Sequence, residues 1–150
     1  MADSGRKAVY LICDRSDPVE TDRAWRLRSE IVEHERLEVA LPETGLPDST
    51  ALYEEHIRRI RTCDAVLLFR AAAPEKWFRL NREDVECEPG RFRQQPFRSR
   101  AIYLADGNRE VGLQQFEASG GLVIHERSGF QIESLDPFLA PLRLGAGRAA

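Results

Sequence analysis

Two short polar segments carry the side chains best suited to chemistry, and each follows directly on an apolar run. In the first, "CDRSD", a thiol, two carboxylates, a guanidinium and a hydroxyl lie within residues 13–17. The segment precedes a predicted helix whose first N–H groups can receive an anion. Four of its residues are therefore candidate ligands for the ribose or phosphates of a nucleotide: Cys13, Asp14, Arg15 and Ser16. The structural alternative is a helix cap with a solvated turn.

The second segment, "RAAAPEKW", follows residues 65–69, an apolar run without alternation that predicts a strand covered on both faces. Ligands of such sheets lie beyond the carboxyl ends of the strands, which places Arg70 beside the candidate site. Glu75 could stabilise the oxocarbenium-like charge formed when an N-glycosidic bond is cleaved, and Trp77 could stack on a base or a nicotinamide. The structural alternatives are an acid in a first helical turn and a tryptophan in the core.

Several familiar chemical motifs are absent from the sequence. Neither Gly-x-Gly-x-x-Gly nor Gly-x-x-x-x-Gly-Lys-Ser/Thr occurs, so a standard dinucleotide-binding fold and a P-loop ATPase are not indicated. There is no Gly-x-Ser-x-Gly elbow of a hydrolase. His34, His56 and His125 are scattered without ligand spacing, and we expect no metal site.

The composition indicates one globular domain in a reducing compartment. The chain has 150 residues, of which 42% are hydrophobic and 31% charged, which excludes a disordered or membrane-embedded class. No apolar run approaches the ~18 residues of a membrane span, so we expect no membrane partner and a cytoplasmic location. Cys13, Cys63 and Cys87 fit neither a zinc site nor a disulfide framework and predict reduced thiols.

The charge pattern does not favour nucleic acid. A net charge of −3 gives no global attraction to phosphate backbones. One local exception is "RFRQQPFRSR", residues 91–100, whose four arginines could clamp phosphates. Four acidic side chains lie just upstream in residues 83–88, and we interpret the arginine segment as an internally neutralised loop.

Strands and helices alternate along the predicted chain. Apolar runs predict five strands, at residues 8–13, 37–41, 65–69, 101–104 and 122–125. Helices are predicted at residues 17–34, 48–61, 75–86, more weakly around 109–117, and from 136 to a disturbance at Pro141. Asp17 is the predicted N-cap of the first helix, Pro18 fits its first turn, and Glu20 sits at the capping-box position.

This alternation predicts an α/β fold, a flavodoxin-like three-layer sandwich. Five strands connected by helices form a parallel sheet with right-handed crossovers, and the expected strand order is 2-1-3-4-5. The switch point then lies between strands 1 and 3. The two polar segments should therefore be neighbours over a nucleotide-sized crevice, with Asp14 and Glu75 on the same side of the molecule.

Several stretches carry a family likeness. "VYLICDRSD" resembles the first strand and turn of Toll/interleukin receptor (TIR) domains, and "RIRTCDAVLLFRAAAPEKW" is similar to the strand that leads to their Trp-bearing helix. "PETGLPD" lies where TIR domains have a loop used in self-association. Residues 7–144 look like the TIR-like modules of bacterial proteins, with a disordered start at 1–6 and a tail or linker at 145–150.

The resemblance implies an activity and its site. Enzymatic TIR domains hydrolyse NAD and release nicotinamide, and their glutamate lies four residues after the helix Trp. In this sequence that position is Asn81, an amide without negative charge, and Glu75 is the carboxylate that could substitute for it. Asn81 joins Trp77 among the residues of the NAD pocket. NAD would be a substrate, and no prosthetic group is implied.

Three functions follow as hypotheses. The first is a TIR-like domain of bacterial signalling or anti-phage defence that assembles through homotypic contacts and hydrolyses NAD. The second is a non-catalytic TIR-like adaptor, for which Asn81 is the signature. The third rests on "VYLI" and "CDAVL", which are similar to strands of nucleoside deoxyribosyltransferases. Expected partners are copies of the chain itself, other domains of a longer protein, or a sensor subunit.

Overall fold

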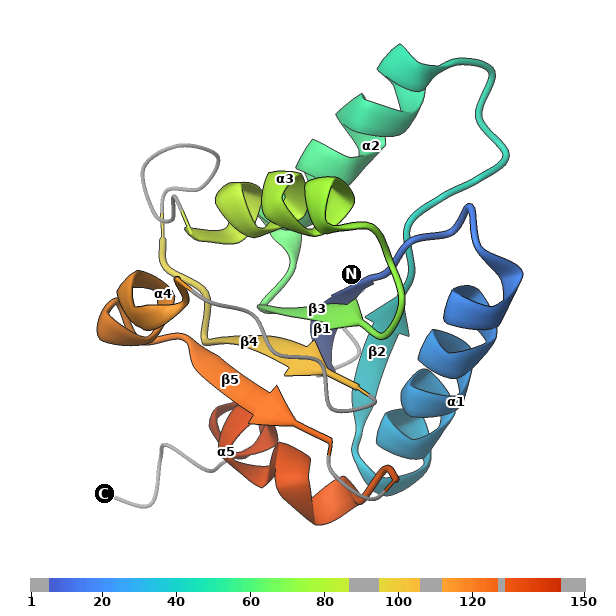
Figure 1. The fold of residues 1–150 in the computed structure, drawn as a ribbon. Coiled ribbons are helices and arrows are strands. Elements are labelled where there is room, and N and C mark those ends of the chain that lie inside the picture. The colour runs from blue at the N-terminus through green and yellow to red at the C-terminus, as the bar shows by residue number, and fades with distance from the viewer. Residues whose placement is uncertain (1–5, 87–94, 106–111, 127–128, 144–150) are drawn as a thin grey trace.

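The fold is a parallel sheet covered by helices on both faces (Figure 1). The structure, a computed structural model, describes residues 6–86, 95–105, 112–126 and 129–143. Its five strands are all parallel and lie in the order β2-β1-β3-β4-β5, which confirms the predicted flavodoxin-like topology. The strands are β1 (Lys7–Ile12), β2 (Leu37–Ala40), β3 (Ala65–Arg70), β4 (Ser99–Leu104) and β5 (Leu122–His125).

Helices form the two outer layers. They are α1 (Pro18–His34), α2 (Ser49–Thr62), α3 (Glu75–Glu86), α4 (Gln114–Ala118) and α5 (Asp136–Leu139), and α5 lies between the 3-10 turns η1 (Ile132–Leu135) and η2 (Ala140–Leu142). In Figure 1, α1 and α5 cover one face of the sheet, while α2, α3 and α4 cover the other. Pro137 lies in the first turn of α5, where a missing N–H is tolerated, and Pro141 has no N–H to extend the helix, so α5 is short.

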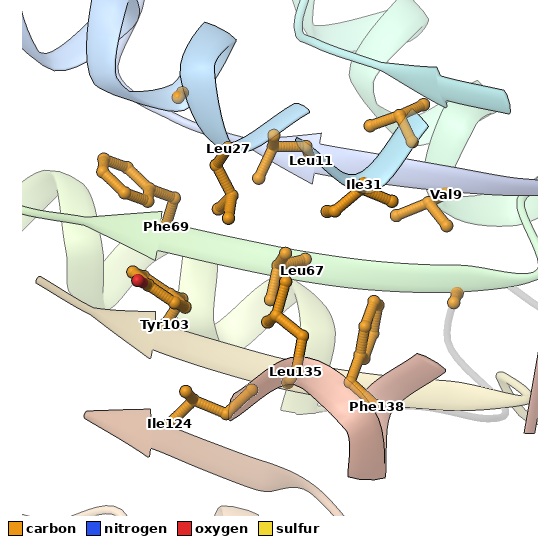
Figure 2. Packing of buried hydrophobic residues seen from close by; sticks show 14 of the residues in the cluster. Val9, Leu11, Leu27, Ile31, Leu67, Phe69, Tyr103, Ile124, Leu135 and Phe138 are labelled. Atoms are coloured by element: carbon orange, nitrogen blue, oxygen red, sulfur yellow. The ribbon is translucent and has the colours of Figure 1, made fainter. Parts of the chain in front are cut away.

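Two separate apolar cores hold the layers together. Successive strand side chains point to opposite faces, so Leu67 packs toward α1 and α5 and Leu68 packs toward α2 and α3. Figure 2 shows the first core, in which Leu27 and Ile31 of α1 meet the central strands. Because both faces are covered, the central strands are apolar without alternation.

The helix starts follow local capping chemistry. The Asp17 carboxylate accepts hydrogen bonds from the backbone N–H groups of Val19 and Glu20, as predicted for an N-cap. Glu20 departs from the predicted capping box, because its carboxylate crosses to the loop after β3. The Asp17 N–H instead approaches the Asp14 carbonyl oxygen at 3.4 Å.

The arginine segment is partly built into the sheet. β4 begins at Ser99, two residues before the predicted start, and its Arg100 is buried. The guanidinium of Arg100 donates to the carbonyl oxygens of Val85 at 2.9 Å and Ser119 at 2.7 Å. It also lies over the Phe116 ring, 5.0 Å from the ring centroid. Arg100 therefore anchors the ends of α3 and α4 to the sheet. The arginines at 91 and 93 lie outside the described residues.

Three further predictions concern the fourth helix and the two ends of the chain. The fourth helix spans Gln114–Ala118, shorter than the predicted 109–117, and residues 106–111 lie outside the described part of the chain. Residues 1–5 and the predicted tail at 145–150 lie outside it as well. Within the described ranges, no helix combines the length and apolar character needed to cross a bilayer.

Candidate functional site

The two polar segments meet at a pocket of about 200 Å³ at the carboxyl edge of the sheet. Four of the eight candidate residues line it: Cys13, Arg15, Trp77 and Asn81. The remaining wall comes from β1, from α2 and from the β2–α2 loop, including Tyr10, His56, Pro42 and Glu43. We call this site the edge pocket. Its position beside β1 and α3 matches the rule that ligands of doubly wound sheets bind near the switch point.

Arg15 joins two loops at the rim of the edge pocket. One terminal nitrogen of its guanidinium donates to the Pro42 carbonyl oxygen at 2.6 Å, which ties the β1–α1 turn to the β2–α2 loop. Its Nε is buried and finds no acceptor among the described residues. Because Nε has no surface open to the pocket, a bound anion would be attracted by the positive charge of the Arg15 guanidinium rather than by a bond to Nε.

Asp14 and Ser16 lie in the same turn but do not line the edge pocket. The Asp14 carboxylate accepts hydrogen bonds from the Ser16 backbone N–H at 3.1 Å and from the Ser16 hydroxyl at 2.7 Å. This local bonding shapes the turn before α1. Both residues therefore perform the structural role described by the cap-and-turn alternative.

Glu75 and Arg70 also lie outside the edge pocket. The Glu75 side chain is 72% exposed, and its carboxylate is 3.9 Å from the Arg79 guanidinium on the same helix. Arg70 donates from Nε to the Ala73 carbonyl oxygen at 2.8 Å and lies over the Phe78 ring. Arg70 therefore fixes the β3–α3 loop, and Glu75 faces away from the pocket that it was predicted to serve.

Trp77 and Asn81 lie one turn apart on α3 and share the pocket wall. The Asn81 amide nitrogen donates to the Trp77 carbonyl oxygen at 2.9 Å. Trp77 is partly buried and packs against the core under α2, α3 and α4. At the position where the TIR resemblance places a carboxylate, the pocket presents a neutral amide.

A part-buried hydrogen-bond network, two members of which line the edge pocket, had no signal in the sequence. The Tyr10 hydroxyl lies 2.8 Å from Nδ1 of His56, and Nε2 of His56 lies 3.1 Å from the Asp84 carboxylate. His56 and Asp84 are each 15% exposed. Burial raises the pKa of Tyr10 well above its usual range, so the phenol stays protonated. The position of the protons on the His56 ring sets the direction of both hydrogen bonds. The spacing of residues in the sequence cannot reveal this hydrogen-bond network, because its members come from β1, α2 and α3.

Glu20 has a role that the sequence did not indicate. Its side chain lies in the core with 1% exposure. One carboxylate oxygen accepts from the Ala71 N–H and the other from the Ala72 N–H, both at 2.8 Å. The first turn of α1 thus fixes the loop after β3. The position of Glu20, three residues after an N-cap, favoured a capping role and hid this one.

Cys13 gives a pH-dependent prediction. Burial raises the pKa of its thiol from about 9 to about 12. A raised folded-state pKa gives stability that is complete below the unfolded value and is lost as pH rises toward the folded value. We therefore expect the free energy of unfolding to fall by about 1 kcal/mol between pH 8 and pH 10 through this group. Urea unfolding across that range measures the fall, and Cys13→Ala should flatten it. Equal slopes for the two proteins would contradict the assignment.

One further cluster lies on the surface of α1. Glu30, Glu33 and His34 have ligand atoms within 4.8 Å of one another, the one such group among the described residues. Two of the three side chains are exposed, and His34 is already bonded through Nδ1 to the Glu30 carbonyl oxygen. These side chains therefore belong to the solvated outer face of α1, and we propose no metal site there.

Comparison with known proteins adds no family assignment. Neither a scan against protein-family models nor a search of curated proteins finds a match for this chain.

Proposed function

We propose that this chain is a TIR-like signalling module that binds a nucleotide such as NAD in the edge pocket without cleaving it. The observation that carries the proposal is the amide of Asn81 in the pocket wall, while the Glu75 carboxylate is 72% exposed outside it. Cleavage of an N-glycosidic bond builds positive charge on the ribose, and a nearby carboxylate stabilises that charge. The acid that does line the pocket, Glu43, is held by Arg59 at 3.1 Å and is half-exposed.

The lining of the edge pocket supports a nucleotide ligand. Arg15 places a positively charged guanidinium at the pocket wall, which favours a phosphate group. Trp77 offers an apolar ring surface for a base or a nicotinamide. A volume of about 200 Å³ suits one ring with part of its sugar, so the second half of a dinucleotide would extend over the sheet edge.

Arg15→Ala is expected to weaken NAD binding by about tenfold or more, because a charge-assisted hydrogen bond contributes roughly 1.5–3 kcal/mol. Isothermal titration calorimetry on the purified chain measures the change. Glu75→Gln is the matched control, since Glu75 lies on α3 but outside the pocket, and it should bind as the unchanged protein does. Equal binding by Arg15→Ala and Glu75→Gln would reject the pocket.

Cleavage is tested on the same proteins. We expect no release of nicotinamide from NAD by the unchanged chain, including at high protein concentration where assembly is favoured. Nicotinamide release that disappears in Glu75→Gln would establish the hydrolase hypothesis instead. Asn81→Glu restores a carboxylate to the pocket wall, and any activity that it gains would show that the bound ribose lies beside residue 81. Exchange of free base into a nucleoside would favour the deoxyribosyltransferase hypothesis.

Self-association is the second part of the proposal, and the β2–α2 loop is its basis. Residues 43–45 of this loop are exposed, and Figure 1 shows the connection extending away from the sheet before α2 begins. We propose homotypic contacts through this loop, with other domains or a sensor subunit as further partners, in bacterial signalling or defence in the cytoplasm. Sedimentation velocity with and without NAD tests it, and a concentration-independent monomer in both cases would count against assembly.

A further inference from the structure

A larger pocket lies on the opposite, α1-covered face of the sheet. Its volume is about 410 Å³, within the usual range for small-molecule sites. It is bounded by α1, by the carboxyl ends of β3 and β4, and by Glu126, Gly129 and Phe130 after β5. We call it the α1 pocket. Its lining shares no residue with that of the edge pocket, so it is a separate site at the same end of the sheet.

The polar anchor of the α1 pocket is Glu126, just after β5. Its side chain is 8% exposed. One carboxylate oxygen accepts from the Arg23 guanidinium at 2.9 Å, and the other accepts from the Tyr103 hydroxyl at 2.7 Å. The carboxylate is therefore held in one orientation by α1 on one side and β4 on the other. Each oxygen has a second lone pair, which leaves capacity for a ligand hydroxyl.

An aromatic wall stands beside this anchor. The rings of Phe69 and Tyr103 are stacked, with centroids 5.7 Å apart, and Figure 2 shows them side by side on neighbouring strands. Phe130 is tilted against Tyr103 with centroids 6.3 Å apart. Gly129, with a φ of 89°, takes the left-handed conformation that turns the chain into Phe130. Phe69 and Tyr103 are themselves buried, with 2% and 1% exposure, so a flat ring here would pack mainly on the partly exposed Phe130 ring, beside a fixed carboxylate.

The charges around the α1 pocket select against ions. Its lining includes two arginines and two glutamates: Arg23, Arg26, Glu30 and Glu126. A ligand anion at the anchor would meet the Glu126 carboxylate, and a ligand cation would meet the Arg23 guanidinium. A hydroxyl group suits the pair, because it can accept from Arg23 and donate to Glu126. Two adjacent hydroxyls would bond to both members of the ion pair, one to Arg23 and the other to Glu126.

We propose that the α1 pocket binds a nucleoside, with its planar base on the aromatic wall and the vicinal hydroxyls of its ribose on the Arg23–Glu126 pair. A carboxylate that hydrogen-bonds ribose hydroxyls is a recurrent device at the carboxyl edge of parallel sheets. Neutral adenosine has both the planar base and the vicinal hydroxyls. It carries no phosphate that the Glu126 carboxylate would repel. This site is independent of the nucleotide proposed for the edge pocket.

Adenosine and 2′,3′-dideoxyadenosine test the proposal, since they share the base and differ in the two hydroxyls. Each is titrated into the ¹⁵N-labelled chain while backbone amide shifts are followed. We expect saturable binding of adenosine, with shifts around Tyr103 and Glu126, and about tenfold weaker binding of the dideoxy compound. Glu126→Gln keeps the shape but removes the charge, and it should weaken adenosine binding by a similar factor.

Two controls separate this site from the edge pocket and from misfolding. Arg15→Ala should leave adenosine binding unchanged, whereas it should weaken NAD binding. Thermal unfolding checks that Glu126→Gln is folded, and Arg23→Met tests the same anchor if it is not. The proposal is overturned by equal affinity for the two nucleosides, by shifts that map to the edge pocket and vanish in Arg15→Ala, or by no binding up to the solubility limit of adenosine.

Discussion

Glu20→Ala is expected to lower the free energy of unfolding by about 3 kcal/mol, because it leaves one buried and one part-buried backbone N–H group without their carboxylate acceptor. These are the N–H groups of Ala71 and Ala72, which approach the Glu20 oxygens at 2.8 Å. The side chain that makes these bonds is itself in the core. Urea unfolding followed by circular dichroism measures the loss.

Two variants bracket the Glu20 result. Glu20→Gln keeps the shape and one acceptor oxygen but turns a donor toward the second N–H, so its loss should lie between those of the unchanged protein and Glu20→Ala. Glu33→Ala removes an exposed acid of the same helix and should change stability by less than about 0.5 kcal/mol. If Glu20→Ala lowered the free energy of unfolding no more than Glu33→Ala does, the hydrogen bonds between Glu20 and the β3–α3 loop would not stabilise the fold.

Gly121→Ala is expected to destabilise the fold by about 3 kcal/mol through overpacking. A Cβ at this position would lie 2.4 Å from the ring of Phe116, the fully buried residue of α4. The Gly121 N–H also donates to the Phe116 carbonyl oxygen at 2.9 Å, so the backbone cannot move away freely. Either the ring leaves its place in the core or the turn into β5 shifts. Thermal unfolding gives the measurement.

A matched glycine and a compensating change define the control. Gly45→Ala places its Cβ in open space and should leave the melting temperature unchanged or raise it slightly. In a Phe116→Leu background, Gly121→Ala should cost less than in the unchanged chain, because the smaller, flexible side chain can yield. Additive losses in the double variant would mean that the ring and the glycine do not meet.

The fold was largely predictable because its signals are local. Apolar runs marked each strand to within two residues, and the Asp17 and Asp48 caps placed the starts of α1 and α2. The order 2-1-3-4-5 followed from the alternation of strands with helices and the handedness of their crossovers. The early start of β4 was missed because an arginine in a charged segment is typical of a loop. In the structure the guanidinium of Arg100 donates to carbonyl oxygens at helix ends.

The site was predictable only in part, because its geometry depends on contacts between distant segments. The edge rule correctly brought Cys13 and Arg15 to Trp77 and Asn81. It could not tell which side chains of each segment face inward, and Glu75 points outward because it lies two residues, about 200° of helix rotation, before Trp77.

The carboxylates that are buried near this end of the sheet gave no pattern in the sequence. Glu20 accepts a hydrogen bond from a residue 51 positions away in the sequence, and Glu126 accepts one from a residue 103 positions away. Such partners are set by sheet topology, which one sequence specifies only through its strands. Composition and spacing could therefore locate the edge of the sheet but could not identify its buried acids.

The bond from Arg15 to the Pro42 carbonyl oxygen has a consequence for regulation. The same guanidinium that would receive a phosphate also restrains the loop proposed for homotypic contacts. If occupancy of the pocket changes the strength of that restraint, ligand affinity and oligomerisation become thermodynamically linked, and each must bias the other by the same factor. A single arginine would then convert the concentration of a metabolite into the degree of association of the chain.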